Sequence, residues 1–139
     1  MDHGFEFFEH TADIGFNVRA EDLETAFELA GKAFFSIMTD LDDIDLQKTE
    51  VFEIISEDKK ALLYDFLDHL VFLKDVEKIV LKDFEIVIKK EKEELSLRCT
   101  ARGQKFKKLT GSDIKAVTYN QMEIIDSEEG CQLKVVVDV

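Results

Sequence analysis

Residues 5–18 read FEFFEHTADIGFNV, two short apolar runs on either side of a polar segment at 9–15. Apolar and polar residues alternate in both runs, which predicts a strand over 4–9 and a neighbouring strand over 15–19. A tight connection between strands needs small polar residues and glycine, so 9–15 is predicted to be the turn of a hairpin. This turn holds His10, Thr11 and Asp13, whose side chains can donate, accept or coordinate.

A helix follows the hairpin. Between residues 23 and 37 the apolar side chains recur every three or four positions and form one continuous stripe. Asp22 is the predicted N-cap, and the helix is expected to end near Thr39.

A second helix is predicted from a cap at Ser56 to about Lys74. Asp65 and His69 lie four positions apart on this helix and are interpreted as a surface pair rather than as two metal ligands. The apolar stripe of the helix comprises Leu63, Phe66, Leu67, Leu70 and Leu73.

The remaining segments alternate as strands do. We predict a strand over 49–55, a hairpin of 79–90 with 94–102, and a final hairpin of 114–125 with 131–137. In the last strand Leu133, Val135 and Val137 face the core, which leaves Asp138 on the opposite side. The order predicts an α+β fold, a single domain over 1–139 with two amphipathic helices packed on a mostly antiparallel sheet.

Composition limits the function. The 139 residues carry a formal net charge of −13, which disfavours direct binding of nucleic acid and favours cations or partners with a basic surface. No apolar run is long enough to span a membrane, and the N-terminus lacks a signal segment, so we expect a cytoplasmic protein. Cys99 and Cys131 have no CxxC spacing and are predicted to be buried thiols.

Familiar catalytic motifs are missing from the sequence. It has no glycine-rich phosphate loop, HExxH, GxSxG or paired CxxC. The acidic segment 40–45 fails the EF-hand pattern, because Asp45 and Val51 stand where a glycine and a glutamate are needed, so an acidic loop is predicted. The basic run 102–108 is interpreted as a loop, with phosphate or an acidic partner patch as the alternative.

Carboxylates at the two ends of the chain could together bind a cation. Asp13, Asp138 and the carboxylate of Val139 are hard oxygen donors that would suit Mg²⁺, Mn²⁺ or Ca²⁺ if the first and last strands are neighbours. His10 would then be near enough to orient a carboxylate or a bound water. From spacing alone, an aspartate that caps a turn and a frayed terminus is the preferred interpretation.

Several segments together resemble the archease family. Residues 4–15 look like its opening signature, 114–119 (IKAVTY) like its second signature, and 137–139 like its acidic tail. The apolar pattern of 26–34 and the run 62–67 also fit. The resemblance spans the whole chain in the right order.

The resemblance implies a small archease-like α+β protein with a strand-helix-strand-strand module. Archeases are non-enzymatic cofactors of the RtcB-type RNA ligase of tRNA splicing and RNA repair. They promote the metal- and GTP-dependent guanylylation of the ligase, which allows multiple turnover. The family's metal site maps onto Asp13, Asp138 and Val139, and the signature lysine maps onto Lys115, which with His10 is expected to contact the partner or the nucleotide.

Two other functions stay open. One is a chaperone-like role toward a tRNA methyltransferase, which has also been attached to the family, and the other is a small metal-dependent hydrolase that uses the same carboxylates. One position departs from the family pattern: the second signature often continues with histidine, whereas this chain has Asn120. Asparagine does not titrate near neutrality, so a histidine's role at this position is in doubt.

Overall fold

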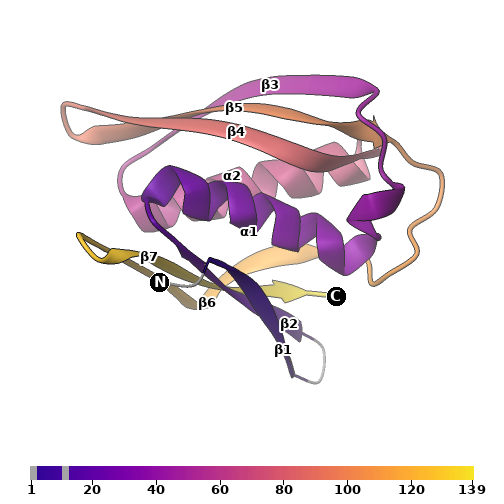
Figure 1. Cartoon of the computed structure of the whole chain (residues 1–139), viewed down its shortest axis with the longest axis horizontal. Coiled ribbons are helices and arrows are strands. Elements are labelled where there is room, and N and C mark those ends of the chain that lie inside the picture. The colour runs from indigo at the N-terminus through magenta and orange to yellow at the C-terminus, as the bar shows by residue number, and fades with distance from the viewer. Residues whose placement is uncertain (1–2, 11–12) are drawn as a thin grey trace.

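Two helices lie between two antiparallel sheets in the computed structural model, which describes residues 3–10 and 13–139 (Figure 1). The four-stranded sheet has the order β1-β2-β7-β6, and the three-stranded sheet has the order β3-β5-β4. The strands are β1 (Gly4–His10), β2 (Asp13–Ala20), β3 (Lys48–Ser56), β4 (Ile79–Glu91), β5 (Glu94–Lys105), β6 (Ala116–Ser127) and β7 (Gly130–Asp138). The α+β prediction is confirmed, but we had not predicted the division into two sheets.

Helix α1 (Leu23–Met38) is buried on most of its circumference because a sheet covers it on each side (Figure 1). The predicted cap is confirmed: the Asp22 carboxylate accepts a hydrogen bond of 2.7 Å from the Thr25 N–H. The helix ends at Met38, and the N–H of its C-cap, Thr39, donates to the Phe35 carbonyl. Its fully buried apolar side chains are Ala26, Phe27, Ala30, Ala33, Phe34, Phe35 and Met38.

Helix α2 (Lys59–Asp75) begins later than predicted. Its N-cap is Asp58, which accepts from the Ala61 N–H at 2.8 Å, so the prediction of Ser56 as the cap is wrong. Ser56 is the last residue of β3, and its hydroxyl donates to the Asp65 carboxylate at 2.7 Å. The His69 ring packs on the Phe52 ring, with centroids 4.3 Å apart, and so has contacts separate from those of Asp65.

The four-stranded sheet brings the two ends of the chain together. Strand β2 pairs with β1 on one side and with β7, the last strand, on the other. Phe16 and Val18 lie opposite Val135 and Leu133, and all four are buried against the helices. Residues of β7 at alternate positions therefore face outward, as predicted for Asp138.

Strand β6 is less regular than predicted. Its pairing with β7 shifts between Thr118 and Glu123, and Gln121 has a φ of 62°. Tyr119, at the start of this bulge, stacks on Tyr64 of α2 with ring centroids 4.3 Å apart. The strand predicted over 114–125 is thus a single strand with a bulge, and it begins at Ala116.

Both cysteines, Cys99 and Cys131, are free and buried, as predicted. Burial raises the pKa of Cys99 to about 12 and that of Cys131 to about 11. Within the described ranges, neither helix has the length and apolar character that crossing a membrane requires.

Candidate functional site

Asp13 and Asp138 lie directly opposite each other at one end of the four-stranded sheet. The same row continues outward on both sides, because His10 of β1 pairs with Asp13 and Ala116 of β6 pairs with Asp138. Asp138 is exposed and Asp13 is half-buried. The fold therefore places an aspartate near the start of the chain beside the last one.

The two carboxyl groups interact. A hydrogen bond shared with Asp13 raises the pKa of the Asp138 carboxyl, and desolvation and the negative charge of Asp13 act in the same direction. Two carboxylates in contact disfavour the state in which both are ionised. A proton or a cation between them would relieve this repulsion, and hard oxygen donors suit Mg²⁺, Mn²⁺ or Ca²⁺.

The next row on the same face of the sheet, two residues along each strand, forms a largely apolar floor beside the carboxylates. It consists of Phe8, Gly15, Val136 and Thr118 on four adjacent strands. The Phe8 ring occupies the space above Gly15, where an added Cβ would be 2.0 Å from the ring. The Lys134 ammonium lies 5.4 Å from the centroid of the same ring, and Val136 is fully buried although it faces outward.

Gly15 is not the turn glycine that the sequence suggested. Strand β2 already begins at Asp13, so Gly15 lies inside the strand. A Cβ at this position would overlap the Phe8 ring, so the ring would have to move to admit a side chain. The connection between the strands falls on residues 11–12, which lie outside the described residues.

The other predicted site residues lie around the aspartate pair. The Lys115 side chain is exposed, and its N–H donates to the Asp138 carbonyl at 2.8 Å. Val139 is half-buried and packs against the core. The backbone of His10 belongs to β1, whereas its side chain lies outside the described residues.

Asn120, which departs from the family signature, is exposed in the bulge of β6, and its N–H donates to the Thr118 hydroxyl at 3.0 Å. Within 3–10 and 13–139, no three or more His, Cys, Asp or Glu side chains form a group that could hold a metal ion. The aspartate pair therefore offers two carboxylates, and further oxygens would come from the main chain, Val139 or water.

Sequence reasoning missed Lys74, a buried lysine on α2 that holds the segment leading to Lys115. A signal for it was present, because position 74 continues the apolar stripe that Phe66, Leu67 and Leu70 begin. A lysine in such a stripe must bury its charge or leave the core, and buried charges are paired.

A cavity of about 1060 Å³ lies elsewhere, between the start of α2, the β4–β5 turn and β6. Its walls include Lys59, Leu95, Met122 and Ile125. Neither Asp13 nor Asp138 lines it.

Comparison with known proteins gives one consistent answer. The sequence model of the Archease protein family matches residues 5–139. A protein archease from Methanothermobacter thermautotrophicus is 40% identical over an alignment of 138 positions, which covers 98% of this chain and 99% of that protein. The solution structure of protein 1598 from Methanobacterium thermoautotrophicum is 40% identical, covers 98% of this chain and 99% of its own, and superposes with a TM-score of 0.87.

A crystal structure from Thermotoga maritima, described as that of an archease and possible chaperone, shares the fold at 24% identity. It covers 95% of this chain and 94% of its own, with a TM-score of 0.54. The family match over nearly the whole chain and the relative at 40% identity agree with the α+β architecture. The chain therefore belongs to the archease family.

Proposed function

We propose that this protein is a metal-binding accessory protein that activates an RtcB-type RNA ligase by promoting its GTP-dependent guanylylation. The observation that supports this most is the placement of Asp13 opposite Asp138 on adjacent strands. The activation allows multiple turnover of the ligase in tRNA splicing and RNA repair, in the cytoplasm. The accessory protein itself carries out no reaction in this proposal.

The donor set fits a hard divalent cation such as Ca²⁺, Mg²⁺ or Mn²⁺. Asp13 and Asp138 would hold it, with an oxygen of Val139 as a further ligand. When bound, the cation would supply positive charge near the phosphates of the nucleotide that the ligase uses. The protein's part is to hold two carboxylates side by side on a rigid sheet, at a surface that a partner can approach.

Charge favours the same partner. A ligase that holds RNA and GTP must present a basic surface, and a chain of net charge −13 is complementary to it. Lys115 provides a positive charge beside the aspartates and is assigned to contact with the nucleotide or with a carboxylate of the partner. His10 is assigned to the same contact, since its backbone lies in the row that contains Asp13.

The test is multiple-turnover ligation by the RtcB-type enzyme with each accessory variant. Asp13→Ala and Asp138→Ala are expected to abolish most of the stimulation. Asp68→Ala, which removes an exposed carboxylate of α2, should stimulate as the wild type does. Folded Asp13→Ala protein that stimulates fully would contradict the proposal.

Two alternatives are separated by companion assays. The Thermotoga relative is described as a possible chaperone, so a chaperone-like role toward a tRNA methyltransferase is the second candidate. Recovery of methyltransferase activity after heat stress, with no effect on the ligase, would favour it. Hydrolysis of phosphoesters or RNA by the isolated protein with divalent metal would instead favour a metal-dependent hydrolase.

A further inference from the structure

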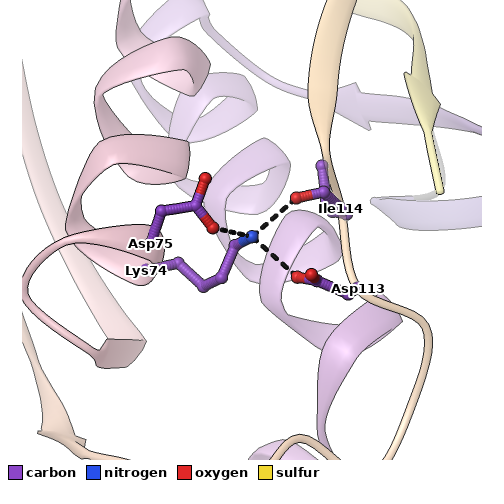
Figure 2. Close-up of polar contacts among 4 residues, drawn as sticks. All are labelled: Lys74, Asp75, Asp113 and Ile114. Carbon is purple, nitrogen blue, oxygen red and sulfur yellow. Dashed lines mark hydrogen bonds and ion pairs between the residues drawn. The ribbon is translucent and has the colours of Figure 1, made fainter.

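Lys74 is a buried cation near the end of α2. Its side chain is 3% exposed, and its ammonium has three acceptors, the Asp75 carboxylate, the Asp113 carboxylate at 2.6 Å and the Ile114 carbonyl at 2.7 Å (Figure 2). An ammonium group has three N–H donors, so all of them are used. The contacts join α2 to the segment that precedes β6.

The Ile114 carbonyl connects this lysine to the candidate site. The carbonyl of Ile114 and the N–H of Lys115 belong to the same planar peptide group. The carbonyl accepts from Lys74, and the N–H donates to the Asp138 carbonyl at 2.8 Å. A hydrogen-bonded chain thus runs from the buried ammonium, through one peptide group, to the main chain of Asp138.

Other contacts hold the earlier part of the same segment. The Gly111 N–H donates to the Met38 carbonyl at 2.8 Å, and the Ser112 N–H donates to the Ile37 carbonyl at 3.1 Å. Both bonds fasten the segment to the end of α1. The Lys74 ammonium then fixes the next two residues, Asp113 and Ile114, before the chain reaches the aspartate pair.

Stability alone does not explain a lysine here. A buried ion pair is often no better for stability than apolar side chains of similar volume. The Asp75 and Asp113 side chains are 49% and 55% exposed, so water can solvate both carboxylates without the lysine. The contact that water cannot replace as readily is the one to the Ile114 carbonyl, because the ammonium reaches it in the interior.

We propose that Lys74 is a positioning residue for the Asp13–Asp138 site, which it orients through the Ile114–Lys115 peptide. It fixes the end of β7 and the start of β6, and so sets where the Asp138 and Lys115 side chains leave the sheet. This inference rests on the proposed function for the role of the site. The hydrogen-bonded chain can be tested without it.

The first experiment is amide hydrogen exchange by NMR on Lys74→Met, which keeps a long apolar side chain and removes the ammonium. The Lys115 N–H is expected to exchange about tenfold faster or more, the scale of a lost hydrogen bond to a charged group. The Ile86 and Ile88 N–H groups, which donate to Glu28 and Glu24 far from this segment in sequence, should keep their wild-type rates. Unchanged exchange at Lys115 would overturn the inference.

Lys59→Met is the matched control. It removes another paired lysine of α2, whose ammonium lies 2.9 Å from the Asp126 carboxylate, about 22 Å away along the helix. Its Lys115 exchange should equal that of the wild type. If Lys115 amide exchange were accelerated equally in both variants, the cause would be a general loss of stability, and the inference would also be overturned.

The second experiment is a calorimetric titration with Mn²⁺ at a temperature where every variant is folded. Lys74→Met is expected to weaken binding about tenfold, as loss of a group that orients metal ligands does, whereas Lys59→Met should not. Equal affinities for wild type and Lys74→Met would reduce Lys74 to a structural residue. A wild type that binds no Mn²⁺ would contradict the proposed metal site, and the exchange experiment would still decide whether Lys74 positions Asp138.

If Lys74→Met does not fold, the wild type supplies the measurement. The Lys74 ammonium protons should exchange slowly with water and show a through-bond coupling between Nζ and the Ile114 carbonyl carbon. Fast exchange without coupling would overturn the inference.

Discussion

Replacing Asp13 by asparagine should stabilise the metal-free protein and prevent its stabilisation by metal. The Asp13 and Asp138 carboxyl groups interact, and when both are ionised, two unit charges about 4 Å apart repel by about 1 kcal/mol in water. Asp13→Asn removes this repulsion and offers an amide donor to Asp138. The free energy of unfolding should rise by up to about 1 kcal/mol, which is roughly 4 °C in Tm for a chain of this size.

Bound metal should reverse which of the two proteins, wild type or Asp13→Asn, is the more stable. At a free Mn²⁺ concentration of one hundred times the Kd, the wild type should gain about 2.7 kcal/mol, whereas Asp13→Asn should gain much less. Urea unfolding with EDTA and with Mn²⁺ measures both differences. The wild type should therefore be the less stable protein in EDTA and the more stable one in Mn²⁺.

Asp68→Asn separates the local effect from the relief of net charge, because it removes the same charge from an exposed position on α2. It should respond to Mn²⁺ as the wild type does. A loss of stability on Asp13→Asn in EDTA would refute the reasoning, since it would mean that Asp13 serves as the cap of a turn. Equal Mn²⁺ stabilisation of wild type and Asp13→Asn would refute it as well.

Three further predictions concern the scaffold. Gly103→Ala should lower the free energy of unfolding, measured by urea titration, by about 1–3 kcal/mol or more, because the added Cβ would lie 1.9 Å from the Val80 carbonyl oxygen. Unchanged stability would contradict this close packing. Burial lowers the pKa of His69 below its ordinary 6.5, so an NMR titration of its ring should give a midpoint below that value, and a midpoint above 6.5 would contradict this. Because the unfolded state takes up the proton first, the contribution of His69 to the free energy of unfolding should be lost as the pH falls below 6.5. Because burial raises the pKa of Cys99 to about 12, iodoacetamide at pH 8 should modify it in urea much faster than in the folded protein, and equal rates would be inconsistent with the structure.

Local patterns predicted much of the fold. The three- and four-residue spacing and Asp22 determined α1 to within its caps, because the signals are local. At α2 two residues could serve as the cap, and the choice of Asp58 over Ser56 depends on where β3 ends and on the contact between Ser56 and Asp65. Alternation shows which face of a strand is buried, but not which sheet contains the strand.

The candidate site could be predicted only in part, because its geometry depends on contacts between residues far apart in the sequence. Residue chemistry marked Asp13 and Asp138 as possible oxygen donors, and only the resemblance to the archease family assigned them to one site. Their pairing depends on β2 lying next to β7, a contact between the two ends of the chain. The role of Gly15 depends on the Phe8 ring on the neighbouring strand. The sequence shows Lys74 as a lysine within an apolar stripe. Its hydrogen-bonded connection to Asp138, however, runs through Ile114, about forty residues later in the chain.

The measurement that tests the cation site most directly is NMR line broadening by substoichiometric Mn²⁺ in the isolated protein. The paramagnetic ion broadens the amide signals nearest to it, so the site is located without any substitution. The signals of Asp13, Lys115 and Asp138 should broaden first, and those of the three-stranded sheet last. Broadening that begins in the acidic segment 40–45, or none at all, would contradict a cation site at the aspartate pair.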